Sequence, residues 1–212
     1  LPRVYSVKAK VKDGLCSVRC KMSLAPIYLQ KILTLDVTYR IGSDGSMDVS
    51  VKAKKEAAMI DLPRFGLRLF LPKAMDQARY YGYGPYESYV DKQRASYMSR
   101  FETTAKENHE DYIRPQENGS HYGCLEAEVT NSRGTGVRAL SEQGFSFNIS
   151  CYTQEELESK KHNFELEESA CSVVCLDYAM GGVGSNSCGP RLKEKYRFNP
   201  SKFTFHIRLE MV

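Results

Sequence analysis

Five acidic side chains are the first residues of this sequence that could do chemistry: Glu87, Asp91, Glu117, Glu126 and Glu128. Hydrolysis by paired carboxylates needs two such groups flanking one bond, about 5–5.5 Å apart for retention and about 6.5–9.5 Å for inversion. Glu126 and Glu128 alternate within a strand-like segment, so they share a face, which is typical of a solvated surface. Glu117 lies in the turn-rich stretch PQENG, where a salt bridge or a turn anchor is the simpler interpretation.

The four histidines could act as bases for a serine or cysteine nucleophile. Their spacing does not favour that chemistry, and the sequence has no G-x-S-x-G motif. His206 alternates within the last strand-like segment, which indicates a packed or edge position. The others are His109, His121 and His162.

Seven cysteines include two CxxxC pairs, Cys16 with Cys20 and Cys171 with Cys175. Zinc sites do use cysteines two to four residues apart, so a metal site is one interpretation. Both pairs, however, lie in alternating segments (CSVRC and CSVVC), where the two residues simply share a strand face. The odd count also argues against a disulfide framework, so we expect reduced, buried thiols in a cytoplasmic protein.

The length of 212 residues suits one large domain or two small ones, of which we expect the single domain, over residues 1–212, and the formal net charge is +4. Residues 1–60 hold 11 Lys and Arg against 5 Asp and Glu, but Lys8, Lys10 and Lys12 alternate with apolar residues, as on a strand with one solvated face. Nucleic-acid binders usually show a concentrated basic patch, and membrane helices need ~20 apolar residues, so we expect neither partner. The chain starts at Leu1 without an initiator Met or a leader, which suggests a fragment of a longer protein.

Alternation with a period of two dominates the chain, and turn signals recur about every ten residues, which is typical of an all-β sandwich. Asp13-Gly14 predicts a hairpin turn, and Thr153 with Glu156 predicts the capped start of a short helix. The expected strands are Val7–Lys12, Leu15–Met22, Ile32–Ile41, Met47–Lys54, Phe65–Leu71, Gly123–Thr130, Gly144–Cys151, Ala170–Tyr178 and Phe203–Leu209.

Two stretches depart from this pattern. Residues 80–123 are rich in Tyr, Gly and Pro and poor in aliphatic residues, so we expect a long irregular region there that packs internally, forms an interface or contacts a ligand. Residues Met180–Pro190 (MGGVGSNSCGP) carry few side chains, and such a loop either lets backbone approach another surface closely or is a plain turn.

Five stretches in order resemble the C-terminal domain of the large β-galactosidases of glycoside hydrolase family 2. They are LPRFGL, YGYGPYESYVD, YIRPQENGSHYG, FSFNISCYT and GVGSNSCGPRL, at Leu62–Leu67, Tyr81–Asp91, Tyr112–Gly123, Phe145–Thr153 and Gly182–Leu192. The resemblance covers about residues 55–212, and residues 1–54 fit the preceding strands of the same domain.

This resemblance implies an antiparallel super-sandwich of the galactose mutarotase-like type that lacks its first strands here. In the family this is the last of five domains, and the two catalytic glutamates lie in an upstream (β/α)₈ barrel. The resemblance therefore implies a retaining hydrolase of terminal β-D-galactosides, cytoplasmic and homo-oligomeric, whose catalytic residues are absent from this chain. The full family enzyme uses Mg and Na ions, and we expect this chain to bind no cofactor.

The family's loop at Gly182–Pro190 forms part of the active-site wall, so the resemblance implies that Asn186, Ser187 and Cys188 contact the galactoside. Some family members carry a sugar-stacking Trp at the position of Cys188, and a Cys stands here instead. Cys188 could make apolar or sulfur contacts, and Asn186 and Ser187 could offer hydrogen bonds.

Two other functions fit parts of the sequence. A non-catalytic carbohydrate-binding module would share the sandwich and the Tyr-rich loops. A free-standing mutarotase would share the fold implied by the resemblance, but the histidine pattern of such enzymes does not map onto the histidines of this chain.

Overall fold

The computed structural model describes residues 1–27, 30–57, 61–183 and 190–212. It contains a short helix, α1 (Gln154–Ser159), and two 3-10 turns, η1 (Asn163–Glu165) and η2 (Glu194–Tyr196). The described strands are β1 (Pro2–Lys12), β2 (Leu15–Leu24), β3 (Leu33–Ile41), β4 (Met47–Lys55), β5 (Arg64–Pro72), β6 (Gln77–Gly84), β7 (Tyr97–Thr104), β8 (His121–Thr130), β9 (Gly136–Ser150), β10 (Cys171–Met180) and β11 (Lys202–Met211).

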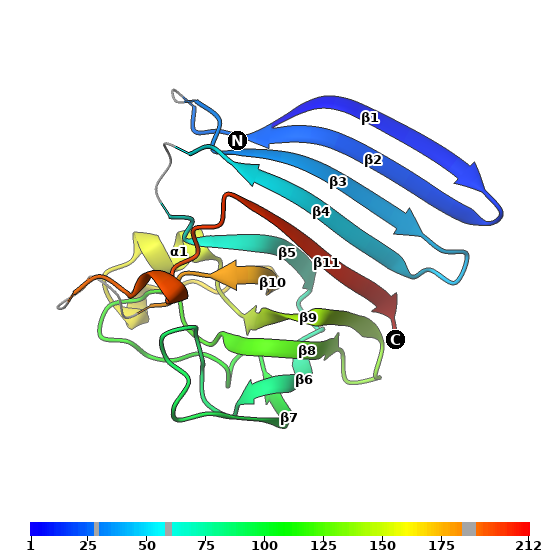
Figure 1. Ribbon diagram of the computed structural model, residues 1–212. Coiled ribbons are helices and arrows are strands. Elements are labelled where there is room, and N and C mark those ends of the chain that lie inside the picture. The colour runs from blue at the N-terminus through cyan, green and yellow to red at the C-terminus, as the bar shows by residue number, and fades with distance from the viewer. Residues whose placement is uncertain (28–29, 58–60, 184–189) are drawn as a thin grey trace.

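Every strand pair is antiparallel, and the strands form one hydrogen-bonded sheet that folds over on itself (Figure 1). One layer runs β1-β2-β3-β4-β11, and the other contains β5, β10, β9, β8, β6 and β7. The long strand β9 joins them, because its first part pairs with β11 and its last part pairs with β10. The predicted all-β, antiparallel sandwich is confirmed.

The core lies between the two layers and follows from the alternation in the sequence. Strand β11 buries Phe203, Phe205, Ile207 and Leu209, and β3 and β4 bury the matching positions of their own alternation. Aromatic rings then connect the layers: the Phe203 ring stacks on Tyr178 of β10 at 4.9 Å, between ring centroids. Burial of this apolar surface is the main stabilising contribution to the fold.

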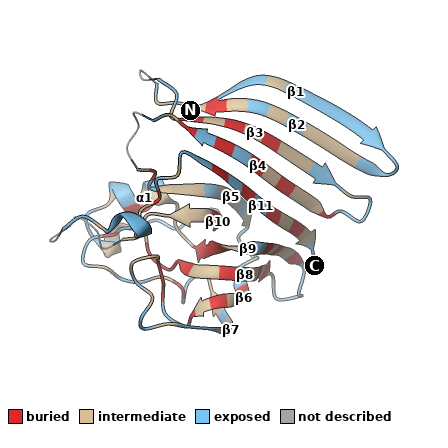
Figure 2. Cartoon of the chain, viewed as in Figure 1, coloured by how far each residue is buried: buried red, intermediate tan, exposed pale blue. Residues whose placement is uncertain are grey.

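The hairpin of β1 and β2 forms as predicted, with Asp13 and Gly14 both at positive φ (51° and 76°), as a two-residue turn requires. Its packing differs from the prediction, because β1 is exposed on both faces rather than one (Figure 2). Val7 and Val11, on the face opposite the lysines, are 59% and 73% exposed. The reason is that β5 and β10 lie under β4 and β11, and no described segment extends beneath β1.

The Tyr-rich region 80–123 is not a single irregular loop. It contains most of β6, all of β7 and the start of β8, separated by loops. The prediction was wrong in these parts because Tyr favours strands, and β6 alternates the buried residues Ala78, Tyr80, Gly82 and Gly84 with outward-facing ones. Strand β9 is also longer than expected, since it begins at Gly136.

Helix α1 begins where the sequence predicts. The Thr153 hydroxyl accepts a hydrogen bond from the Glu156 amide at 3.1 Å, which satisfies one of the free amides of the first turn. Leu157 is the buried residue of this helix and anchors it on the second layer.

Candidate functional site

A cavity of about 770 Å³ opens beside the base of the glycine-rich segment 181–190. Its lining divides into a polar floor, which includes Arg64, Glu117 and Gln154, and an apolar side. The apolar side is formed by Leu62, Pro63, Met180, Leu192 and Phe198. The predicted contact residues Asn186, Ser187 and Cys188 lie outside the described residues.

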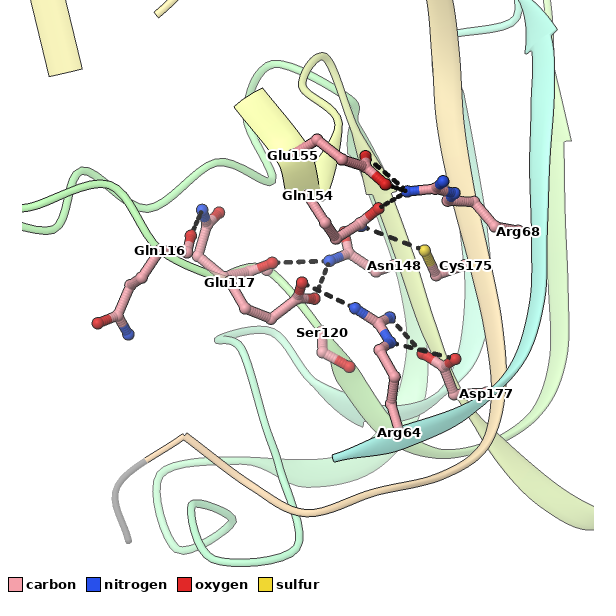
Figure 3. Close-up of polar contacts among 12 residues, drawn as sticks. Arg64, Arg68, Gln116, Glu117, Ser120, Asn148, Gln154, Glu155, Cys175 and Asp177 are labelled. Atoms are coloured by element: carbon pink, nitrogen blue, oxygen red, sulfur yellow. Dashed lines mark hydrogen bonds and ion pairs between the residues drawn. The ribbon is translucent and has the colours of Figure 1, made fainter. Parts of the chain in front are cut away.

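The floor is built on one guanidinium shared by two carboxylates (Figure 3). Arg64 donates from Nη2 and Nε to Asp177, at 2.5 and 3.4 Å, and from Nη1 to Glu117 Oε2 at 2.8 Å. The second oxygen of Glu117 accepts from Asn148 Nδ2 at 3.1 Å. The predicted salt-bridge role of Glu117 is therefore confirmed, and its partner is a residue that the sequence analysis did not select.

Local backbone structure brings Arg64 and Asp177 together. Arg64 opens β5, and Asp177 lies on β10, directly opposite Gly66 in the strand register. A Cβ atom on Gly66 would come within 2.3 Å of the Leu176 carbonyl and 2.5 Å of the Asp177 carboxylate. The absence of a side chain at Gly66 therefore leaves the space in which the Asp177 carboxylate meets the guanidinium.

Burial dominates the electrostatics of this cluster. It raises the pKa of Glu117 and of Asp177, because removing a carboxylate from water disfavours its charged form. Burial alone would lower the pKa of Arg64, but the charges of Asp177 and Glu117 outweigh it and raise that pKa. Arg64 therefore stays charged and stabilises both carboxylates.

Amide side chains from two segments hold the loop that carries Glu117: Asn108 lies in the loop between β7 and β8, and Asn148 lies on β9. Asn148 donates to the Asn118 carbonyl at 2.7 Å, and Asn108 donates to the Gly119 carbonyl at 2.7 Å. The Gly119 amide in turn donates to Glu87 Oε2 at 2.8 Å. This network fixes the loop that carries Glu117 over the end of the sheet.

Two smaller spaces adjoin the cavity and share its polar floor. One of about 440 Å³ is lined by Glu117, Gln154 and Leu157 among others, and one of about 330 Å³ by Arg64, Gln154 and Asp177 among others. Gln154 lines all three spaces. Its side chain is fixed by Arg68, which donates to Oε1 at 2.8 Å, and by its own Nε2–H, which donates to Cys175 Sγ at 3.4 Å.

Aspartates hold the described residues on either side of the segment 184–189. Asp91 accepts from the Val183 amide at 3.3 Å on one side. On the other side Asp61 accepts from Arg191 at 2.7 Å and from Arg197 at 2.6 and 2.9 Å. The hydrogen bond from Arg197, with the Arg191 and Arg197 charges, lowers the pKa of Asp61, so these ion pairs persist at neutral pH.

The other candidate residues from the sequence, Glu126, Glu128 and His121, lie on the sheet surface or in the core. Glu126 and Glu128 lie on the outer face of β8, as predicted, and Glu126 pairs with Arg100 at 3.1 Å. His121 is buried, stacks on Tyr80 and contacts Asn108 Oδ1 through Nε2 at 2.7 Å. In the described ranges, no three His, Cys, Asp or Glu side chains gather closely enough to hold a metal ion.

Comparison with known proteins identifies the family. The profile of the family described as "Beta galactosidase small chain" matches residues 3–209. The chain belongs to this β-galactosidase small-chain family. The small-chain domain is 47% identical over 210 residues to a β-galactosidase of Actinobacillus pleuropneumoniae, a match that covers 99% of this chain and 20% of that protein. It is 40% identical over 176 residues to a β-galactosidase of Staphylococcus xylosus, covering 83% of this chain and 18% of that protein.

The small-chain domain thus spans about one fifth of the length of the relatives that it matches. Among solved structures, an Escherichia coli protein described as a candidate aldose 1-epimerase aligns with 98% of this chain and 69% of its own, at 11% identity and a TM-score of 0.44. No described helix is long and apolar enough to cross a membrane.

Arg64, Gln154 and Asp177 are not among the candidate site residues predicted from the sequence. A signal for Asp177 was present, because a single acidic residue stands within the otherwise apolar strand CSVVCLDYAM. A carboxylate buried in such a strand requires a charged partner. Its partner Arg64 is 113 residues away in the sequence, so spacing alone does not reveal the pair.

Proposed function

We propose that this chain is the small-chain part of a β-galactosidase that hydrolyses terminal β-D-galactosides with retention of configuration. The observation that carries the proposal is the 47% identity over 210 residues to one fifth of the A. pleuropneumoniae enzyme. The catalytic acid and nucleophile belong to the remaining part of the full-length protein in this proposal, as do its Mg and Na ions. The buried acids of this domain have a different task, because Glu117 and Asp177 are both ion-paired with Arg64.

The proposed contribution of the domain is one wall of the galactoside pocket. Residues 182–190 would form that wall, with Asn186, Ser187 and Cys188 facing the sugar. Support comes from the segment's surroundings: it adjoins the cavity of about 770 Å³, and Asp91 and Asp61 tether the described residues on its two sides. A segment tethered at both ends loses less entropy when it contacts a ligand.

We also propose that the rest of the full-length protein packs under the β1–β2 hairpin. The face that carries Val7 and Val11 continues the apolar face of β3 and β4 without a break, yet it is exposed. In the described sheet, β1 pairs on one side only, so its other edge can accept a strand. Covering this face would bury apolar surface at about 25 cal/mol per Å².

The proposed location is the cytoplasm, with the full-length enzyme acting as a homo-oligomer. All six cysteines in the described part are free thiols, which fits a reducing compartment. Cell fractionation followed by size-exclusion chromatography of the full-length protein tests both statements, and a monomer or a secreted protein would contradict them.

Complementation tests the main proposal. A family β-galactosidase is truncated just before the segment that matches Leu1, this chain is added, and hydrolysis of a chromogenic β-galactoside is followed. We expect activity on mixing and none from either half alone. Turnover by this chain alone would contradict the proposal, and so would a mixture that forms a stable complex but stays inactive.

Variants of the assembled enzyme test the pocket wall. Deletion of residues 181–190, or Asn186→Ala, Ser187→Ala and Cys188→Ala, should raise KM or lower kcat while the complex still forms. Arg133→Ala, in the exposed turn between β8 and β9, is the matched control. Unchanged kinetics in the deletion variant would remove the pocket role but leave the complementation result intact.

A further inference from the structure

We propose that Glu117 and Arg64, with Gln154 beside them, bind the hydroxyl groups of a neutral pyranose in the cavity above the Arg64 cluster. The inference rests on the proposed function and deepens it, because it assigns sugar contacts to described residues outside the segment 184–189. Its basis is the shape, the charge and the hydrogen-bonding capacity of the cavity.

The cavity has the size and the two-sided lining of a ligand pocket. Its volume of about 770 Å³ lies within the range of roughly 300–1,000 Å³ that such pockets occupy. Glu117 and Arg64 line it although their side chains are only 18% and 24% exposed. The side chains of Leu62, Met180, Leu192 and Phe198 also line the cavity and offer an apolar surface for the C–H face of a sugar ring.

The charges of the lining are paired with one another, which favours a neutral ligand. Arg64 pairs with Glu117 and Asp177, and Asp61 pairs with Arg191 and Arg197. Counting these six groups, three positive charges meet three negative ones. An anion would meet the Glu117 carboxylate and find no unpaired positive charge among these six groups. A cation would meet the Arg64 guanidinium and find no unpaired negative charge among them. Either ion would therefore lose its water without gaining a partner, which is unfavourable.

The same groups retain hydrogen-bonding capacity for hydroxyls. A guanidinium has five N–H donors, and Arg64 uses one each from Nε, Nη1 and Nη2 in its contacts with the two carboxylates. A carboxylate offers about four lone-pair sites, and the contacts from Arg64 and Asn148 occupy one on each oxygen of Glu117. A hydroxyl both donates and accepts, so a sugar can use Glu117 and Arg64 together.

Preorganisation distinguishes this arrangement from an ordinary surface ion pair. Asn148 and Arg64 fix both oxygens of Glu117, and Asp177 fixes Arg64, so neither side chain has to be ordered when a ligand arrives. Binding then avoids most of the rotamer entropy that long charged side chains normally lose.

Saturation-transfer NMR on the purified 212-residue chain tests the inference, with methyl β-D-galactopyranoside as the probe and methyl-proton dispersion as the check of folding. We expect transfer to the sugar with a Kd in the millimolar range, weakened about tenfold or more by Glu117→Gln. Leu192→Trp, which adds bulk to the apolar lining of the cavity and leaves Arg64 and Glu117 unchanged, should abolish transfer. Glu102→Gln, in an exposed ion pair with Arg79, is the control and should bind as the unmodified chain does. Methyl β-D-galacturonide, the anionic analogue of the probe, should give less transfer.

Two outcomes would overturn the inference: no transfer to a folded chain, or transfer that Leu192→Trp leaves unchanged. If Glu117→Gln fails to fold, Leu192→Trp still decides. The outcome is separable from that of the proposed function. Restored hydrolysis in the complementation assay with no sugar binding at this cavity would refute only the inference. Sugar binding together with a stable but inactive complex would refute only the proposed enzyme.

Discussion

Arg64 and Glu117 lie 53 residues apart in the sequence, and Arg64 Nη1 donates to Glu117 Oε2 at 2.8 Å. Arg64 opens β5, whereas Glu117 belongs to the loop between β7 and β8. Because Arg64 also binds Asp177 of β10, one guanidinium connects three segments that meet only in the folded chain. The floor of the cavity is therefore a product of the tertiary fold and should be sensitive to any loss within the cluster.

Removal of the Asp177 carboxylate should strongly destabilise the fold. The Asp177 side chain is 5% exposed, and its loss leaves the Arg64 guanidinium buried with a weaker partner. We expect Asp177→Ala to lower the free energy of unfolding by about 3–5 kcal/mol, measured by urea denaturation.

Glu155→Gln is the matched control for Asp177→Ala. It also breaks a carboxylate–arginine pair, but the Glu155 side chain is 67% exposed. Such a pair contributes about 0–1 kcal/mol. A cost for Asp177→Ala no larger than for this control would contradict the idea that the cluster supports the fold.

Stability should fall in mild acid because of His121. Burial lowers the pKa of His121 to about 4, so the ring stays neutral in the fold, whereas in the unfolded chain it takes up a proton below about pH 6.5. Above pH 6.5 the ring is neutral in both states and its depressed pKa has no effect on stability. As the pH falls toward 4, the unfolded chain binds a proton that the fold does not, so stability is lost progressively. The loss should amount to about 3 kcal/mol.

Urea denaturation at several pH values between 7 and 4 measures this effect. The variant His121→Gln retains a donor for Asn108 and does not titrate, so its free energy of unfolding should depend less on pH over this window. His206→Gln, on the exposed face of β11, should keep the pH dependence of the unmodified chain. Parallel pH profiles for all three proteins would show that His121 does not cause the acid sensitivity.

A charge on the exposed face of β1 should reduce self-association of the isolated chain. Val11→Lys places an ammonium group in the apolar strip beside the free edge of β1, where strand pairing between copies would begin. We expect a larger monomer fraction in size-exclusion chromatography, with the free energy of unfolding changed by less than about 0.5 kcal/mol.

In the complementation assay the same Val11→Lys variant should assemble less well. Lys10→Gln, on the opposite face of β1, is the control and should leave both association and complementation unchanged. If Val11→Lys restores activity as fully as the unmodified chain, the hairpin face does not pack against the rest of the enzyme.

The cap of α1 should have a measurable effect on stability. Thr153→Ala removes the hydroxyl that accepts from the Glu156 amide and should cost about 1 kcal/mol in the free energy of unfolding. Thr153→Ser keeps the acceptor and should cost much less. Equal losses in the two variants would mean that the methyl group of Thr153, rather than its hydroxyl, is what stabilises the helix start.

Local patterns in the sequence predict much of this fold. The Asp13-Gly14 turn, the alternating strands and the capped helix after Thr153 all depend on neighbouring residues, and all three are present. Strand β6 was missed because its buried positions are Gly, Ala and Tyr rather than aliphatic residues, and β7 was missed because none of its residues is buried. The exposure of β1 on both faces depends on which strands lie beneath it, and alternation within one strand does not encode that.

The candidate site was harder to predict from the sequence than the fold. A salt bridge at Glu117 is predictable from its place in a turn-rich loop, but its partner depends on the pairing of β5 with β10. The resemblance predicted sugar contacts for Asn186, Ser187 and Cys188. These residues lie in the segment 184–189, outside the described residues. The polar floor next to that segment is made from residues of three distant segments, so no single motif contains it.

Strand β9 takes part in both layers, through Val137–Leu140 beside β11 and Ser146–Ser150 beside β10. Neither layer can therefore separate from the other without breaking the hydrogen bonds that β9 makes with β11 or with β10. The two layers should melt together as a single cooperative unit rather than as two independent subdomains. Mechanical strain applied at β11 would then reach Asn148, and through it Glu117, along one continuous length of backbone.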